Sequence, residues 1–151
     1  MPRVRAAVQM PGLASEAEAL WYDPQRWPAW VDGFGHLVKL EGEWPAQGAR
    51  AVWDSKPGGR GRVAERVTAF EARAGQTLAV EDEQLTGTQR VTFEPGQDGV
   101  EVALELSYDL KASSVFTPLT DALFIRRALR ESLERNLTRF GRELRADREL
   151  A

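Results

Sequence analysis

The chain contains no cysteine and only one histidine, His36. The missing cysteines exclude disulfides, thiolate nucleophiles and cysteine-ligated zinc, and a single histidine excludes a histidine-rich metal site. No apolar run is long enough to cross a membrane. The first ten residues alternate in polarity and lack the apolar core of a signal peptide. We therefore expect a cytoplasmic protein with no metal, no cofactor and no integral membrane segment.

Recognised catalytic and nucleotide-binding motifs are also missing. No Gly-x-Ser-x-Gly sequence is present. Residues 59–64 imitate a dinucleotide-binding fingerprint, but they lie between two predicted strands and open no helix, so we interpret residues 56–61 as a mobile hairpin. His36 lies in a glycine-flanked loop, where a structural or exposed role is the expected one.

The composition that remains is ordinary for a globular protein. The chain has 151 residues, of which 42% are hydrophobic and 28% charged, and its net charge is −3. This length predicts a single domain over residues 1–151. The small negative charge gives no reason to expect a nucleic-acid partner. A monomer and a homodimer are both compatible with the sequence.

The first part of the chain predicts one strand and two short helices. Residues 3–9 alternate as a strand does. Ser15 and Glu18 have the spacing of a capping box, which predicts a helix from Ser15 to about Tyr22. Asp23 followed by Pro24 predicts the start of a second short helix, which we expect Pro28 to end.

The middle of the chain predicts six strands separated by turns rich in glycine and proline. Val100–Leu110 alternates most clearly, with apolar residues on one face and polar residues on the other, as in an antiparallel sheet with one wet face. The other predicted strands are Val38–Gly42, Ala49–Ser55, Arg62–Glu71, Thr77–Gln84 and Gln89–Glu94.

The last part predicts one long amphipathic helix. Thr117 and Pro118 form a cap-plus-proline start, and the helical pattern continues to about Asp147. Such a helix needs a long apolar partner surface, and the strands are the candidate. We expect Leu129, Leu133 and Phe140 to be buried within a stripe of Leu119, Ala122, Ile125, Leu129, Leu133, Leu137, Phe140 and Leu144. Segregated strands and helices indicate the α+β class.

Three segments then resemble a known family. They are Asp23–Trp30 (DPQRWPAW), Gly48–Trp53 leading into Gly61–Val67 (GRVAERV), and the terminal helix. Together with the element order, they resemble the polyketide cyclase/dehydrase-like members of the START-related (SRPBCC) superfamily. The resemblance implies a helix-grip fold: a curved seven-stranded antiparallel sheet around a long C-terminal helix, with two short helices after the first strand. It also implies a cavity between sheet and helix.

The resemblance gives two positions a particular meaning. Aromatase/cyclases of this superfamily tend to place a pocket tyrosine and a pocket arginine at the positions that correspond to Phe34 and Phe70 here. Phenylalanine cannot transfer protons. The comparison therefore implies a pocket that keeps its shape without that acid/base machinery.

Candidate pocket residues are aromatic or apolar side chains, together with polar side chains that alternate in step with the apolar residues of their strand and so point inward. Trp21 is expected to fill the core, whereas Trp27, Trp30 and Trp53 are expected to be pocket walls, because ligand pockets are mainly apolar and aromatic. An aromatic box for a quaternary amine is an alternative. For each polar candidate, an ordinary satisfied side chain is as plausible as a ligand contact. The full set is Trp27, Trp30, Phe34, Trp53, Arg66, Phe70, Asp82, Gln89, Val91, Phe93, Leu104, Leu106, Tyr108, Leu129, Leu133 and Asn136.

The facing of Arg66 is left open. Pairing of the hairpin with Leu78 and Val80 places Val67 and Ala69 inward, whereas the family comparison places Arg66, Thr68 and Phe70 inward. A bulge would reconcile the two arrangements.

The sequence thus favours a carrier or sensor of a small hydrophobic or aromatic molecule, such as a lipid, a polyketide or a quinone-like compound. We expect an internal cavity of at least ~300 Å³ to hold it. The alternative is a polyketide cyclase or dehydratase, in which Tyr108, Asp82, Arg66 and His36 remain as proton-handling candidates. A third alternative is an interaction module with a filled core.

Overall fold

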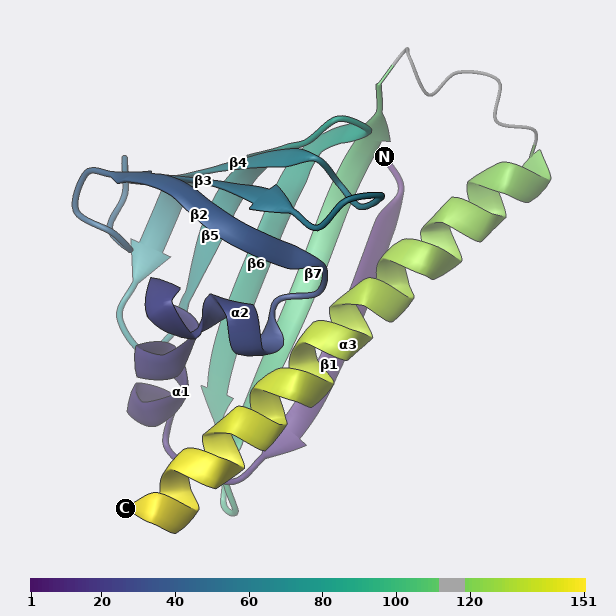
Figure 1. Cartoon of the computed structure of the whole chain (residues 1–151). Helices are drawn as coiled ribbons and strands as arrows, with labels where there is room; N and C mark the ends of the chain where they lie inside the picture. Colours follow the sequence, from purple (N-terminus) through teal and green to yellow (C-terminus); the bar gives the residue numbers. More distant parts are fainter. Residues whose placement is uncertain (112–118) are drawn as a thin grey trace.

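The computed structural model describes residues 1–111 and 119–151, and in these it shows a curved antiparallel sheet with a long helix across its concave side (Figure 1). The predicted helix start at Thr117 and Pro118 lies outside the described residues. The described strands form one seven-stranded sheet in the order β1-β7-β6-β5-β4-β3-β2. They are β1 (Arg3–Met10), β2 (Phe34–Glu41), β3 (Arg50–Ser55), β4 (Arg62–Glu71), β5 (Gly75–Glu81), β6 (Leu85–Pro95) and β7 (Val100–Leu110).

The sheet buries one face, as the alternation in its last strand predicts. Val91 and Phe93 of β6 lie opposite Leu104 and Val102 of β7, and all four are buried. Directly opposed apolar side chains on one face are the unit that stabilises an antiparallel sheet. The predicted bounds of β4 and β7 are confirmed, whereas β2 begins four residues earlier than expected, at Phe34.

Short helices follow β1, as predicted, but their ends differ from the prediction. Helix α1 (Ala14–Trp21) is capped by Glu16, whose carboxylate accepts a hydrogen bond of 2.9 Å from the backbone N–H of Leu13. The predicted capping box of Ser15 and Glu18 is wrong. The observed N-cap is Leu13, two residues before Ser15, and Glu18 instead accepts from the backbone N–H of Arg73 at 2.5 Å.

The second short helix has two parts. Asp23 caps a 3-10 turn, η1 (Pro24–Arg26), by accepting a 3.0 Å hydrogen bond from the N–H of Gln25. Helix α2 (Trp27–Trp30) follows directly, with Pro28 in its first turn. The expectation that Pro28 ends the helix is therefore wrong, since proline lacks only an N–H that the first turn leaves unpaired anyway.

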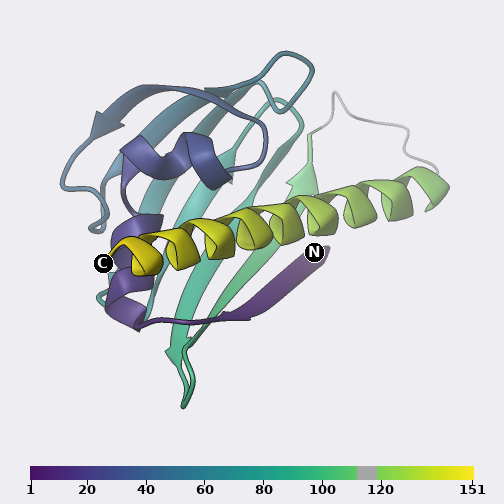
Figure 2. The same ribbon diagram turned by 60° about the horizontal axis from the view of Figure 1, so that its bottom comes forward.

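Helix α3 (Leu119–Leu150) is 32 residues long and packs chiefly on β1, with further contacts to α1 and α2. Figure 2 shows it crossing the open side of the sheet, with α2 beside it. Leu133 and Phe140 are buried as predicted, but Leu129 is only half-buried and Ala122 is exposed. Ile125 and Leu129 pack against the edge of the core while only partly buried. None of the described helices combines the length and hydropathy needed to cross a membrane.

A bulge in β4 resolves the facing of its side chains. The register with β5 shifts between Val67 and Ala69, so Val67 is buried, whereas Arg66 is exposed. Phe70 turns back toward the core, where its ring lies 5.5 Å from that of Tyr22. The predicted bulge is confirmed, but the inward positions expected for Arg66, Thr68 and Ala69 are wrong, since all three are exposed.

Candidate functional site

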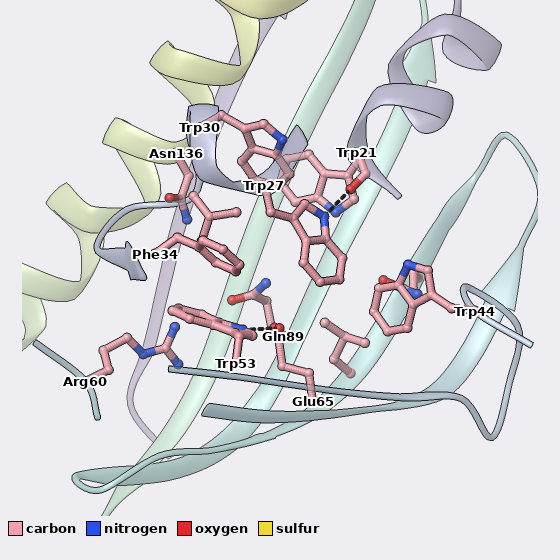
Figure 3. A pocket seen from close by; sticks show the side chains of 13 residues that line it. Trp21, Trp27, Trp30, Phe34, Trp44, Trp53, Arg60, Glu65, Gln89 and Asn136 are labelled. Atoms are coloured by element: carbon pink, nitrogen blue, oxygen red, sulfur yellow. Dashed lines mark hydrogen bonds between the residues drawn. The ribbon is translucent and has the colours of Figure 1, made fainter. Parts of the chain in front are cut away.

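The candidate site is a small pocket enclosed by α1, α2, the sheet and α3 (Figure 3). Its volume is about 50 Å³, which contradicts the expected cavity of at least ~300 Å³. The difference arises because large aromatic side chains occupy most of the space that the backbone leaves. The lining residues are Trp21, Trp27, Trp30, Val31, Phe34, Trp44, Trp53, Arg60, Glu65, Gln76, Leu78, Gln89 and Asn136.

Aromatic rings form much of the pocket wall, and several of them also belong to the hydrophobic core. The centroids of Trp21 and Trp30 are 4.2 Å apart, and Phe34 lies 5.1 Å from Trp53 across the pocket. Trp27 meets Trp44 edge to face at 5.4 Å, and its indole Nε1 donates a 2.9 Å hydrogen bond to the carbonyl of Trp21. These contacts fix the rings in an arrangement that suits a flat or apolar molecule.

A carboxyl group is part of this wall. Trp53 on β3 donates from Nε1 to Oε1 of Glu65 on β4, at 2.8 Å, a contact drawn in Figure 3. Glu65 points inward because it alternates with the buried residues Val63 and Val67. Burial raises the pKa of Glu65, and this effect outweighs the opposing influences of Arg60 and of the hydrogen bond from Trp53.

Arg60 is the second charged residue of the lining. Its guanidinium lies 5.5 Å from the ring centroid of Trp53, in a cation–π contact. Its Nε donates at 2.8 Å to Asp82, whose side chain is almost fully buried. Asp82 also accepts from the backbone N–H groups of Gln84 and Leu85. Asp82 therefore closes the turn between β5 and β6 and anchors Arg60. Asp82 itself does not line the pocket.

Two buried polar atoms of the lining have no hydrogen-bond partner among the described residues. They are Nε1 of Trp30 and Oε1 of Gln76. The amide nitrogen of Gln76 is satisfied by the carbonyl of Pro45 at 3.1 Å, so only its oxygen is left over. Because buried polar groups are normally paired, these two atoms leave hydrogen-bonding capacity unused beside the pocket.

The α2 segment, which runs from Arg26 to Asp32 and covers the pocket, is connected to α3 by polar contacts. Asn136 accepts a 2.6 Å hydrogen bond from the backbone N–H of Asp32, just after α2. The Asp32 carboxylate accepts from Ser132 at 2.7 Å and pairs with Arg135 at 2.9 Å and Arg139 at 3.2 Å. These contacts hold the α2 segment down over the pocket.

The structure brings together six of the sequence-predicted site residues, namely Trp27, Trp30, Phe34, Trp53, Gln89 and Asn136. The other ten lie outside the lining. Arg66 is exposed, Phe70 packs on Tyr22, Asp82 closes a turn, and Leu129 borders a separate apolar groove beside β7. The rest are buried in the core beyond the pocket: Val91, Phe93, Leu104, Leu106, Tyr108 and Leu133.

Sequence reasoning missed several lining residues. Trp21, which the sequence predicts to fill the core, does so while also forming part of the wall. Glu65 and Gln76 were predictable from the alternation of their strands. Glu65 points to the same face as Val63 and Val67, and Gln76 points to the same face as Leu78. Trp44 and Arg60 come from loops, which strand parity cannot place. His36, in contrast, is exposed at the sheet edge near Asp54.

No group of three or more histidine or carboxylate side chains that could hold a metal occurs in the described part of the chain. The side chains that line the pocket offer aromatic contacts, hydrogen-bonding groups and the carboxyl group of Glu65.

Comparisons with known proteins agree with this architecture. Residues 1–145 match the family model described as polyketide cyclase / dehydrase and lipid transport. The protein TTHA0849 of Thermus thermophilus superposes with a TM-score of 0.76 at 19% identity, over 97% of this chain and 99% of that one. No curated protein matches the chain in sequence.

Two further structures come from biosynthetic pathways. The di-domain ARO/CYC StfQ of the steffimycin pathway matches with a TM-score of 0.75 at 19% identity, over 96% of this chain and 51% of StfQ. DynU16, from the dynemicin biosynthetic locus, matches with a TM-score of 0.67 at 18% identity, over 95% of this chain and 47% of DynU16. At these identities the similarity establishes the fold.

Proposed function

Because the chain belongs to the polyketide cyclase / dehydrase and lipid transport family, we propose that its central pocket binds a small hydrophobic or aromatic molecule, which the protein carries or senses. A lipid, a polyketide or a quinone-like compound would fit this chemistry. The observation that carries the proposal is the pairing of aromatic walls with two unpartnered polar atoms, on Trp30 and Gln76. A pocket with that lining provides apolar contact and a few orienting hydrogen bonds.

Binding at this site must enlarge the pocket. A volume of about 50 Å³ holds water but no aromatic ring, which needs on the order of 150 Å³. The α2 segment is the element expected to move, since α2 is a single turn and lies over the pocket between β2 and α3. Its displacement would carry the Trp27 and Trp30 rings away from the sheet and make room for a ligand.

The test is a titration with N-phenyl-1-naphthylamine, a neutral probe whose fluorescence rises in apolar surroundings. Trp30→Ala should tighten probe binding several-fold, because it removes a ring that fills the pocket and must otherwise move aside for a ligand. The matched control is Leu144→Ala, which also truncates a buried side chain but lies outside the pocket. Equal affinities in both variants and in the unmodified protein would contradict the proposed site.

One observation supports the cyclase or dehydratase alternative. Glu65 places a carboxyl group with a raised pKa in the pocket, where it could move a proton to or from a poly-β-ketone. The proton-handling candidates from the sequence lie outside the lining of the pocket: Tyr108, Asp82, Arg66 and His36. If the protein cyclises a poly-β-ketone and Glu65→Gln abolishes that reaction while substrate binding survives, the enzyme alternative replaces the carrier.

A further inference from the structure

We propose that Glu65 selects the ligand: it donates a hydrogen bond from a protonated carboxyl group to an uncharged acceptor on the bound molecule, such as a carbonyl oxygen. This inference rests on the proposed function, since it concerns the same pocket. It assigns that pocket a preference for apolar molecules that carry a neutral oxygen acceptor, over hydrocarbons of the same shape and over cations.

The geometry leaves one oxygen of Glu65 for a ligand. Trp53 occupies Oε1 at 2.8 Å, and no other hydrogen bond to the Glu65 side chain is present among the described residues. Trp53 is itself held between the ring of Phe34, at 5.1 Å, and the guanidinium of Arg60, at 5.5 Å. The carboxyl group therefore faces the pocket in a fixed orientation, which is the condition for a selective contact.

The surroundings favour the protonated form of this carboxyl group. Glu65 and Arg60 are the charged residues among those that line the pocket. The Nε of Arg60 donates its hydrogen bond to Asp82 rather than to Glu65. Burial raises the pKa of Glu65 despite the nearby Arg60. A neutral carboxyl group keeps one O–H to donate, whereas an ionised one can only accept.

The other polar atoms around the pocket agree with an oxygen-bearing ligand. The unpartnered Nε1 of Trp30 is a second donor, and the unpartnered Oε1 of Gln76 is an acceptor. A cationic ligand would find the positive charge of Arg60 in the same wall, which disfavours it. The arrangement thus offers donors for ligand oxygens in a largely aromatic enclosure.

Two probes of nearly equal shape test the inference directly. 2-Acetylnaphthalene and 2-ethylnaphthalene differ by one carbonyl oxygen, and their dissociation constants can be measured by quenching of tryptophan fluorescence. The unmodified protein should bind the ketone roughly 3- to 10-fold more tightly, the value of one hydrogen bond. Glu65→Leu should remove this preference while 2-ethylnaphthalene binding persists, and Glu65→Gln should retain it, since an amide can also donate.

A second readout needs no ligand. In the unfolded chain the pKa of a glutamate is about 4.3, and in the folded protein that of Glu65 is raised, so ionisation costs stability as the pH rises above the unfolded value. The stability of the unmodified protein relative to Glu65→Gln should therefore fall between about pH 4.3 and the folded pKa. Urea denaturation over this range measures it.

The outcomes separate the two proposals. Equal binding of both probes to the unmodified protein would overturn the role of Glu65 and leave the pocket as a binding site. Tighter binding of a naphthylmethyl trimethylammonium ion than of the ketone would also overturn it, since it would indicate an ionised Glu65. If no probe binds in the pocket, both proposals fail. A stability difference from Glu65→Gln that does not change with pH contradicts the protonated carboxyl group alone.

Discussion

At the scale of single residues, the buried leucines of α3 connect helix and sheet. Leu133, Leu137 and Leu144 are each at most 4% exposed, whereas Leu123, nearer the start of the helix, is 60% exposed. Since burial of apolar area is the main stabilising contribution, the grip of the helix on the sheet depends on its second half.

Leu133 gives the first prediction. Leu133→Ala should lower the free energy of unfolding by about 2–5 kcal/mol, because the side chain is buried in a packed core and its loss leaves a cavity. Leu133 does not line the pocket, so the low end of that range is not expected. Urea denaturation measures the effect, with Leu123→Ala as the exposed control on the same helix. A loss no larger than that of the control would contradict the packing described for α3.

The residue scale also shows what the sequence could and could not predict about the site. Trp27, Trp30 and Phe34 were predicted from their aromatic character and from the family resemblance, and all three line the pocket. Val91 and Leu104 were predicted from apolar parity alone, which identifies the buried face of a strand. Parity cannot say whether a buried side chain meets a cavity or the core, since that depends on where neighbouring side chains end.

At the scale of elements, the α2 segment is held between two clusters of charge on α3. Arg26 contacts Asp147 at 2.9 Å and Glu143 at 3.2 Å, before α2. Asp32 contacts Arg135 and Arg139 after α2. These clusters fasten both ends of a one-turn helix that has little stability of its own. They set the ease with which the pocket opens.

The Asp32 cluster gives a prediction with a defined pH dependence. Burial alone would raise the pKa of Asp32, but hydrogen bonds from Arg135 and Ser132, with the charge of Arg139, hold it below its usual value. A lowered folded pKa means that the stabilisation is present above the unfolded value of about 3.9 and is lost as the pH falls further. Asp32→Asn should therefore destabilise the protein by about 1 kcal/mol at pH 7, and the difference should shrink below pH ~4.

The measurement is urea denaturation of both proteins at pH 7 and at pH 3. Glu41→Gln is a suitable control, because Glu41 also pairs with a cation, Arg50, but is exposed and screened by solvent. Asp32→Asn should also speed the release of a bound naphthyl probe, whereas the control should not. A destabilisation that is equal at both pH values would show that the Asp32 charge does not fasten the segment.

Element boundaries show a further limit of prediction from sequence. The pattern at Ser15 and Glu18 predicted a helix cap, and Pro28 predicted a helix end. The structure forms neither at these positions. Glu18 bonds to the backbone of Arg73, far along the chain, and no local pattern reveals such a partner. The order of elements depends on periodicity over many residues, which explains why it was predictable when the ends were not.

At the scale of the whole molecule, the order of strands and helices determined the fold, and side-chain volume determined the pocket. The helix-grip arrangement and the family follow from one short strand, two short helices, six strands and a long helix. The size of the space between sheet and helix does not follow, because five tryptophans point into or near it and their rotamers decide how much remains. The expectation of a large cavity failed for this reason.

We expect an aromatic molecule to enter the pocket between α2, the sheet and α3. Titration of ¹⁵N-labelled protein with 2-acetylnaphthalene, followed through the five indole N–H signals, tests it most directly. Each signal can be assigned by Trp→Phe substitution. Saturable shifts are expected for the signal of Trp30, whose Nε1 has no partner among the described residues, and for that of Trp53, which donates to Glu65. Saturable binding that leaves both indole signals unchanged would contradict it.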